Sequence, residues 1–432
     1  MTHSLEWPSL TCQWLPNINI TDPACAATAP QASSSSGNST SNSNSASASA
    51  SPTSTHSLLI GTHTTPGEQN YLMVANVELP NSDYNSQQIA TTSGAAKYDD
   101  ERGEVGGFFT ENGNVDGKIE IKLKVKHDGE VNRARYMPQN HFVVASKGPS
   151  PEVYVFDLSK HPSFPDADSA PAPQHILRGH TSEGYGLAWD PHTHSSNKKL
   201  LSGSEDCKVC LWDLAEASTV VLNALCSFEG HTDVVEDVAW HTRDPNMIGS
   251  VGDDRAIFLW DVREHQEPAH KIVNAHAGDI NGIAFNPVNE FLFATSSADK
   301  TVALWDARNL KTRMHTLQGH TDQVFQVEWA PFNETILGSC SADRRVNIWD
   351  LSRIGQEQSV EDAEDGPPEL LFVHGGHTSK VSDFCWNRND EWTIASVSED
   401  NILQIWNMAE EIYAGDDDDD NDDDELDEGE LE

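Results

Sequence analysis

A ten-residue pattern that recurs five times limits the folds open to this chain. Each copy runs from a polar turn into a short apolar strand and ends in Trp followed by Asp or Asn. The copies are residues 204–213, 252–261, 297–306, 341–350 and 398–407. An aspartate always lies six residues before the tryptophan, and a serine or threonine lies ten residues before it. Because successive copies start 44 to 57 residues apart, each belongs to a structural unit of about that size.

A histidine completes the pattern in every unit, usually 29 residues before the tryptophan. A period of about 40–45 residues with Gly-His and Trp-Asp marks is typical of WD-repeat β-propellers. Inside a blade, the imidazole, hydroxyl, carboxylate and indole N–H can form one hydrogen-bonded chain, which satisfies polar groups that burial would otherwise leave unpaired. We therefore interpret these residues as structural tetrads rather than as metal ligands or catalysts. Two complete sets are His231, Ser250, Asp254 and Trp260, and His320, Ser339, Asp343 and Trp349.

The number of strand-like runs predicts an all-β, seven-bladed WD-repeat propeller over residues 58–412. The last unit, which ends at Trp406, has three strands and lacks a fourth. We expect the N-terminal segment 1–20 to complete that blade through its isolated strand at residues 8–15. Joining the first and last strands in one sheet removes two free edges that would otherwise invite aggregation.

Two segments have the composition of disordered chain. Residues 21–57 are rich in serine and have almost nothing to bury, so we predict a disordered insertion. Residues 413–432 form an acidic tail, which we also predict to be disordered. The formal net charge of the whole chain is −42. Such a surface repels nucleic-acid phosphates and attracts basic proteins, so we expect no direct contact with nucleic acid.

Motifs for catalysis, cofactors and membranes are missing from the sequence. We find no GxSxG, GxxxxGK[ST] or HExxH motif, and no GxGxxG after a strand, which argues against an enzyme. Cys207 and Cys210 form a CxxC without a second pair, so we expect neither a metal nor another cofactor. The seven cysteines fit a reducing compartment, and no apolar run approaches the length of a membrane span.

The residues that follow each repeat histidine enter the innermost strand and face the top of the central channel. At fixed offsets after these histidines lie carboxylates, amides and aromatic rings. Carboxylates beside aromatic rings suit an arginine or lysine side chain, through bidentate hydrogen bonds and cation–π contact. We predict that this rim binds basic peptides; the alternative is a rim that is polar only because solvent reaches it. The predicted rim residues are Glu130, Asn132, Glu183, Tyr185, Glu236, Asn281 and Phe325.

Longer motifs in the chain are LEWPSLTCQWLP, GEVNRARYMPQN, GHTSEGYGLAWDP, TDVVEDVAWH, SADKTVALWDARNL and EDAEDGPPELLFVHGGHT. Together they resemble the retinoblastoma-binding, multicopy-suppressor-of-Ira family of histone-binding WD-repeat proteins, which includes the small subunit of chromatin assembly factor one. The resemblance covers nearly the whole chain except the serine-rich insertion and the acidic tail. Plain WD-repeat proteins do not carry the EDAEDGPPELLF segment, so this motif is highly specific.

The resemblance implies a non-catalytic histone chaperone and scaffold with two binding sites. The first is the channel rim, which in the family takes the basic N-terminal tail of core histone three; the resemblance adds His63 and Glu399 to this rim. The second is an acidic proline loop, residues 354–372, that takes the first helix of core histone four. Its candidate arginine partners are Glu361, Asp362, Glu364 and Asp365. The family completes this second groove with a long N-terminal helix, whereas the chain begins at MTHSLEWPSL, so we expect weaker binding there than at the rim.

The resemblance also implies partners and a location. We expect a monomer within hetero-complexes that include subunits of chromatin assembly, histone deacetylase, nucleosome remodelling and Polycomb complexes. Its location would be the nucleus, with some protein in the cytoplasm. A different class stays open, that of a WD-repeat substrate receptor of a cullin-type ubiquitin ligase. Such a receptor needs a docking helix or box outside the propeller, and co-purification of histones or of cullin scaffolds would separate the two classes.

Overall fold

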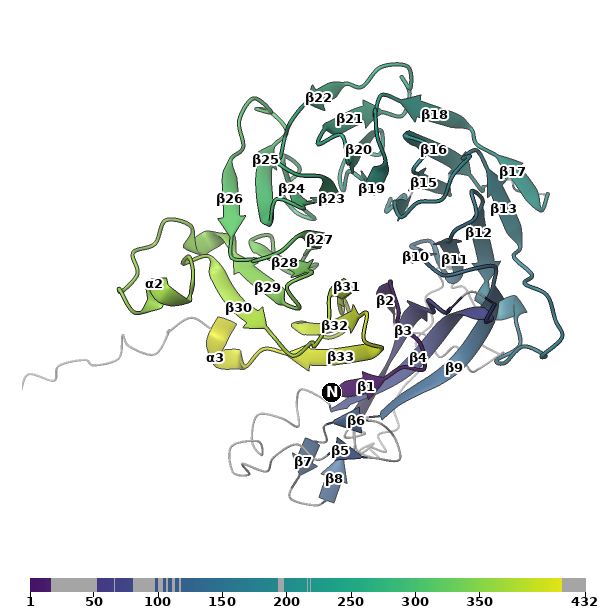
Figure 1. Cartoon of the computed structure of the whole chain (residues 1–432), viewed down its shortest axis with the longest axis horizontal. Coiled ribbons are helices and arrows are strands. Elements are labelled where there is room, and N and C mark those ends of the chain that lie inside the picture. Colours follow the sequence, from purple (N-terminus) through teal and green to yellow (C-terminus); the bar gives the residue numbers. More distant parts are fainter. Residues whose placement is uncertain are drawn as a thin grey trace, which may run out of the picture.

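Seven β-sheets stand around a common axis in the computed structural model of the chain (Figure 1). The structure describes residues 1–16, 53–65, 67–80, 118–192, 198–215, 217 and 219–413, together with the backbone of four short strands between residues 98 and 115. Each of the seven sheets contains four consecutive antiparallel strands, and two of the sheets are extended by further short strands. The predicted all-β, seven-bladed propeller is therefore confirmed.

Each blade runs from the axis outward. The innermost strands are β2 (Cys12–Leu15), β10 (Arg133–Met137), β14 (Leu187–Trp189), β19 (Val235–Trp240), β23 (Ile280–Phe285), β27 (Val324–Trp329) and β31 (Val381–Trp386). The second strands are β3 (Thr53–Gly61), β11 (Asn140–Lys147), β15 (Lys199–Gly203), β20 (Met247–Gly252), β24 (Leu292–Ser297), β28 (Ile336–Ser341) and β32 (Thr393–Ser398). The third strands are β4 (Asn70–Pro80), β12 (Val153–Asp157), β16 (Lys208–Asp213), β21 (Ile257–Asp261), β25 (Thr301–Asp306), β29 (Val346–Asp350) and β33 (Ile402–Asn407). The outermost strands are β9 (Lys118–His127), β13 (His175–Arg178), β18 (Cys226–Glu229), β22 (His270–Ile272), β26 (His315–Gln318), β30 (Leu370–His374) and β1 (Thr2–Ser4).

A few short elements lie outside this four-strand plan. β17 (Val221–Asn223) crosses from the third blade to pair in parallel with β13 of the second. The remaining strands are β5 (Tyr98–Asp99) and β6 (Glu104–Val105), which extend the last blade, and the separate pair β7 (Phe108–Thr110) and β8 (Gly113–Val115). The helical turns are η3 (Leu158–Lys160), η4 (Leu351–Arg353), α2 (Asp362–Asp365) and α3 (Glu410–Tyr413).

Two separate strands of the N-terminal segment close the ring. β1 pairs antiparallel with β33, with Thr2 opposite Gln404, and so forms the outermost strand of the last blade. β2 pairs instead with β3 and is the innermost strand of the first blade. The prediction that residues 8–15 complete the last blade is therefore wrong, although residues 2–4 provide the closure. Trp14 explains the difference, because it stands near the end of an innermost strand, as Trp240 does in the fourth blade.

The structure also changes one predicted boundary. The end of the serine-rich insertion predicted at residues 21–57 belongs to β3, where Thr55 pairs with Glu78 of β4. The rest of that insertion, up to residue 52, lies outside the described residues. The predicted acidic tail at residues 413–432 lies outside them as well, except for Tyr413 at the end of α3.

Hydrogen bonds join the tetrad residues inside the blades. In the fourth blade, Trp260 Nε1 donates to Ser250 Oγ at 2.9 Å, and His231 Nε2 lies 2.8 Å from the same oxygen. His231 Nδ1 lies 3.0 Å from Asp254 Oδ2. Because an ionised carboxylate can only accept, Nδ1 carries the proton and the Ser250 hydroxyl donates to Nε2. The sixth blade repeats the chain, with distances of 2.8 Å for Trp349 to Ser339, 2.8 Å for Ser339 to His320 and 2.9 Å for His320 to Asp343.

The tetrad aspartate also holds the turn that precedes the third strand. Asp254 accepts the backbone N–H groups of Thr232 at 3.0 Å and Ala256 at 3.1 Å. These bonds fix Arg255 at a φ of 58°, a left-handed conformation that costs a non-glycine residue roughly 1–2 kcal/mol. The equivalent residues Cys207, Lys300, Arg344 and Asn401 have positive φ too. The carboxylate thus has to stand at this one place in the repeat, which accounts for its constant distance from the tryptophan.

Tryptophans of the innermost strands connect neighbouring blades. Trp189 Nε1 donates to the Arg135 carbonyl at 2.9 Å, and Trp240 Nε1 donates to the Ala188 carbonyl at 3.0 Å. The indole rings lie in apolar clusters that combine residues of two adjacent sheets. The hydrophobic core is therefore divided among the contacts between blades, and the innermost strands stay in register around the axis.

Candidate functional site: the channel rim

The predicted rim residues lie where the chain enters the innermost strands. Glu236, Asn281 and Phe325 are the second residues of β19, β23 and β27. Asn132 immediately precedes β10, and Tyr185 lies two residues before β14. The innermost strands surround the axis in Figure 1, and each begins at the equivalent point of its blade. The five side chains therefore start from one end of the ring.

Direct contacts join rim residues across two blade boundaries. His63 Nε2 lies 3.4 Å from Glu130 Oε1, which connects the first and second blades. Asn132 Nδ2 donates to Glu183 Oε2 at 3.5 Å, which connects the second and third. All four side chains stay partly open to solvent except that of Asn132, which is buried. Carboxylates of two blades thus lie side by side at the same end of the channel.

Glu236 is the most perturbed carboxylate of the rim. Burial raises its pKa to about 7, and the nearby Asp253 carboxylate adds to the rise, whereas Arg133 acts in the opposite direction. Burial also raises the pKa of the Tyr185 hydroxyl, and the charges of Glu183 and Glu236 contribute to that shift. Within the part of the chain that the structure describes, Glu236 forms no ion pair. Its negative charge is poorly solvated and lacks a close cation.

Three predicted rim residues stand apart from this group. Asn281 Nδ2 donates to the Val324 carbonyl at 2.8 Å, so its amide links the fifth blade to the sixth. Phe325 is half-buried and packs against the apolar cluster between the sixth and seventh blades. Glu399 is exposed in the turn after β32, where its backbone N–H bonds the Lys380 carbonyl at 3.1 Å.

Further carboxylates near the rim were not predicted from the sequence. Glu205 and Asp253 contribute to the raised pKa of Glu236. Burial and the neighbouring Asp279 raise the pKa of Asp253 itself to about 6. Both residues directly precede the tetrad aspartate of their repeat, which is also the position of Glu399. The repeat pattern therefore contained the signal that could have identified them.

A buried charge network lies on the innermost strands and was not predicted either. Asp383 of β31 is fully buried, and its Oδ2 accepts the Cys12 N–H at 2.9 Å and lies 3.3 Å from Arg135 Nη2. Its Oδ1 lies 3.9 Å from Arg133 Nη1. One carboxylate therefore holds together the seventh, first and second blades, at the place where the ring closes.

Lys147 replaces a tryptophan in the tetrad of the third blade. Trp212 Nε1 donates to the Arg178 carbonyl at 3.3 Å, and Lys147 Nζ donates instead to the tetrad hydroxyl of Ser202 at 2.9 Å. Lys147 comes from β11 of the second blade, and its carbonyl accepts the Asn132 N–H at 2.9 Å. Burial lowers the pKa of its ammonium group to about 7. This side chain fixes the position of two neighbouring rim segments from below.

The acidic proline loop forms a separate surface beside the sixth blade. Its four predicted carboxylates are all exposed on or next to the short helix α2, and Ser359 Oγ donates to Asp362 Oδ2 at 2.7 Å. An open cleft of about 310 Å³ lies against this helix. Asp362 and Asp365 line the cleft, whereas Glu361 and Glu364 do not. The cleft is lined by Arg353, Gln356, Glu357, Gln358, Asp362, Asp365, Gly366, Pro367, Pro368 and Leu370.

Metal sites and membrane-spanning helices are both missing from the described residues. No group of three or more His, Cys, Asp or Glu side chains in these parts of the chain could hold a metal ion. Among the same residues, no helix has both the length and the apolar character needed to cross a membrane.

Comparisons with known proteins agree with this architecture and first define its class. Residues 171–213 and 368–407 match the profile of the WD domain, G-beta repeat, and residues 235–349 match that of the EIPR1 beta-propeller. A solved structure, the WD40 beta propeller domain of Doa1, is 16% identical with a TM-score of 0.54 over 82% of this chain and 91% of that one. At this identity the likeness concerns the fold alone. The chain is a WD-repeat β-propeller protein.

The N-terminal segment narrows this class to one family. Residues 1–81 match the profile of the histone-binding protein RBBP4, which the same profile describes as a component of the CAF1 complex. This segment includes β1 and β2, the two strands that close the ring. Together with its WD repeats, the match shows that the chain belongs to the RBBP4-type family of histone-binding WD-repeat proteins.

Proposed function

We propose that the chain is a non-catalytic histone-binding chaperone and scaffold, and that its rim binds the basic N-terminal tail of core histone three. Membership of a histone-binding family supports the general role. The observation that carries the specific proposal is the half-buried Glu236, a carboxylate with a pKa of about 7. A lysine or arginine of a bound peptide would supply the cation that this group lacks in the free protein.

The neighbours of Glu236 suit the same ligand. Glu183 adds a second carboxylate, and Tyr185, with 37% of its surface exposed, offers a ring face for cation–π contact. Glu130 lies on the next blade boundary, beside His63. A peptide with several cations along its length could therefore pair with several carboxylates of the rim at once, and a peptide with one cation could not.

Binding of the tail should depend on pH in a direction that follows from Glu236. Its raised pKa means that most copies are protonated at pH 6 and ionised at pH 8, whereas a bound cation favours the ionised form. Peptide affinity should therefore rise about tenfold between pH 6 and pH 8, with release of a proton below pH 7. Titration calorimetry of full-length protein with a histone three tail peptide measures both quantities.

The variant Glu236→Gln provides the control for this pH dependence. It keeps the shape of the side chain and removes its titration, so the difference between the two pH profiles isolates Glu236 from every other titrating group. Equal slopes for wild type and variant would show that Glu236 does not meet a cation. Acetylation of the peptide lysines should weaken its binding to the wild-type protein.

We further propose that the acidic proline loop binds the first helix of core histone four. The exposed carboxylates of α2 support this proposal, as does the cleft that Asp362 and Asp365 share with Pro367 and Pro368. Arginines along one face of a helix could pair with the carboxylates, while its apolar side chains contact the proline wall.

A variant with Asp362 and Asp365 both changed to asparagine tests this second surface. We expect about tenfold weaker binding of a histone four helix peptide and unchanged binding of the histone three tail peptide. The matched control changes Glu361 and Glu364 to glutamine, because these residues carry the same charges in the same loop outside the cleft. Equal losses in the two double variants would mean that the loop acts through its overall charge alone.

Complex membership follows from the same proposal. A scaffold that holds histone tails on one face and a histone helix on its side can deliver histones to the subunits of chromatin assembly, deacetylase, remodelling and Polycomb-type complexes in the nucleus. Co-purification of tagged full-length protein from nuclear extract should recover histones together with subunits of one or more of these complexes. Recovery of cullin scaffolds without histones would contradict it.

A further inference from the structure

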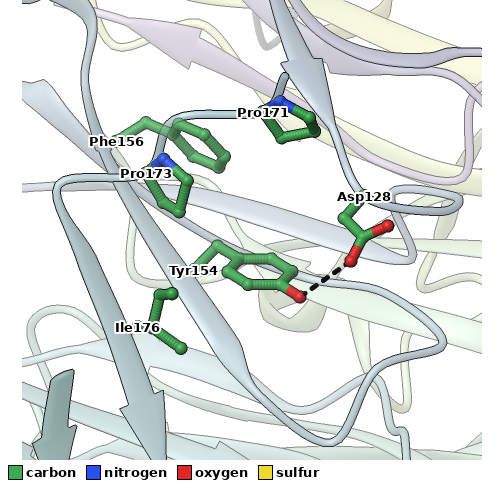
Figure 2. Close-up of a pocket in the computed structure, with 6 residues that line it drawn as sticks. All are labelled: Asp128, Tyr154, Phe156, Pro171, Pro173 and Ile176. Atoms are coloured by element: carbon green, nitrogen blue, oxygen red, sulfur yellow. Dashed lines mark hydrogen bonds between the residues drawn. The ribbon is translucent and has the colours of Figure 1, made fainter. Parts of the chain in front are cut away.

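A cleft of about 280 Å³ lies on the second blade, apart from the rim residues and from the acidic proline loop. Tyr154 and Phe156 of β12 and Ile176 of β13 form one part of its wall (Figure 2). Pro171 and Pro173 come from the chain that precedes β13, and Asp128 comes from the turn after β9. Phe156 stands where most other repeats carry tryptophan, so this blade departs from the repeat at the cleft itself.

The cleft combines an apolar wall with one polar end. Tyr154 Oη donates to Asp128 Oδ2 at 3.2 Å, and Figure 2 shows this pair on the side of the cleft away from Pro173 and Ile176. Asp128 is exposed, whereas Tyr154 is 8% exposed and presents little more than the part of its ring that lines the cleft. A carboxylate next to an aromatic ring attracts a cation, and the prolines and isoleucine attract methylene groups.

The segment that carries the prolines is fastened to the blade. Lys126 Nζ donates to the carbonyls of Ala167 at 2.6 Å and Ser169 at 2.7 Å, and this lysine is 6% exposed. Gln174, which follows Pro173, accepts the Asp157 N–H through its side chain at 2.5 Å. A wall held at both ends needs little ordering when a ligand binds, which favours affinity.

We propose that this cleft binds one lysine or arginine side chain of the same basic peptide that the rim holds. The methylene stem would lie against Pro171, Pro173 and Ile176, and the charged head would meet Asp128 and the Tyr154 hydroxyl oxygen. Asp128 accepts from Tyr154 through one carboxylate oxygen, so its second oxygen can accept from the ligand. The proposal rests on the proposed function of the rim and extends the bound length of the peptide.

The position of the cleft fits a continuous peptide. Asp128 and Glu130 are two residues apart, so their Cα atoms are separated by at most about 7.6 Å. An extended peptide advances about 3.3–3.6 Å per residue, so a chain that contacts Glu130 reaches Asp128 some two to three residues later. The cleft therefore selects for a cation at one position of the peptide, in addition to the general attraction of the acidic rim.

The test is a double-mutant cycle between the protein variant Asp128→Asn and a histone three tail peptide long enough to extend past the rim. Asp128→Asn should weaken binding of the full peptide about three- to tenfold. One cationic position of the peptide should lose affinity on substitution by alanine with the wild-type protein but not with Asp128→Asn. Asp168→Asn is the matched control, since it removes the same charge from an exposed residue of the proline segment that does not line the cleft.

The outcomes separate the cleft from the rim. If Asp128→Asn binds as well as wild type while Glu236→Gln binds more weakly, the cleft proposal is overturned and the rim proposal stands. Equal losses with Asp128→Asn and Asp168→Asn would also overturn it, because they would reflect general charge. If the wild-type protein binds no tail peptide at all, the proposed function fails and the cleft proposal fails with it. Thermal unfolding of each variant checks that all of them are folded.

Discussion

Replacement of Asp383 by alanine is expected to lower the free energy of unfolding by about 3–5 kcal/mol, because it leaves buried positive charge without a partner. The carboxylate is fully buried and lies 3.3 Å from Arg135 Nη2 and 3.9 Å from Arg133 Nη1. It also accepts the Cys12 N–H, which would become an unsatisfied buried donor. Urea unfolding followed by tryptophan fluorescence and by circular dichroism measures the loss.

Two comparisons test the cause of this loss. Asp261→Ala breaks an aspartate–arginine pair as well, but its partner Arg263 is exposed, so we expect a loss of less than about 1 kcal/mol. Adding Arg135→Met to Asp383→Ala removes one of the buried charges and should recover part of the lost stability. A loss at Asp383 no larger than that at Asp261 would mean that solvent reaches the network and that it does not hold the closure.

Replacement of Glu236 by alanine is expected to weaken binding of the histone three tail by about 2–5 kcal/mol. The loss is large because the carboxylate is half-buried, and a peptide cation brought to the same place would be desolvated without a partner. Stability should not fall, since burial of this charge is unfavourable in the free protein. Its raised pKa stabilises the fold only where the side chain is protonated, and that contribution disappears as the pH rises through about 7.

Glu229→Ala is the matched control for the rim variant. Glu229 lies on the outermost strand of the third blade, 2.6 Å from the ammonium group of Lys208, and is exposed. Its removal lowers the acidic charge by the same amount far from the rim, so the affinity should change by less than about 0.5 kcal/mol. Unchanged calorimetric titration with Glu236→Ala would contradict the assignment of this residue to the rim.

Features that depend on short stretches of sequence could be predicted. The tetrad aspartate accepts from residues of its own unit, such as Thr232 and Ala256 for Asp254, so the pattern repeats at fixed spacing and predicts seven blades. The rim positions follow from the same spacing, because each precedes or begins an innermost strand by a constant offset. Glu205 and Asp253 were missed although they occupy a repeated position, since the predicted rim included residues after the histidine and left out those before the aspartate.

Features that depend on contacts between distant units could not be predicted. Asp383 meets Cys12 across 371 residues of sequence, and Lys147 meets Ser202 across 55. No local pattern marks such partners, and each replaces a group that the repeat would normally provide. The closing strand was misassigned for a related reason. The segment that holds Thr2 and Trp14 contributes to two different blades, and hydrophobic patterning alone does not say which strand joins which sheet.

The pairing of β1 with β33 has a consequence for biosynthesis. Translation delivers residues at about 5–20 per second, so roughly 20–80 seconds separate the appearance of Thr2 from that of Gln404, its partner. Throughout that time Leu5, which is 6% exposed in the finished protein, has no neighbouring sheet from the last blade to cover it. The first segment to leave the ribosome is thus among the last to find its place, and a nascent chain of this kind needs shielding from aggregation until its final repeat has emerged.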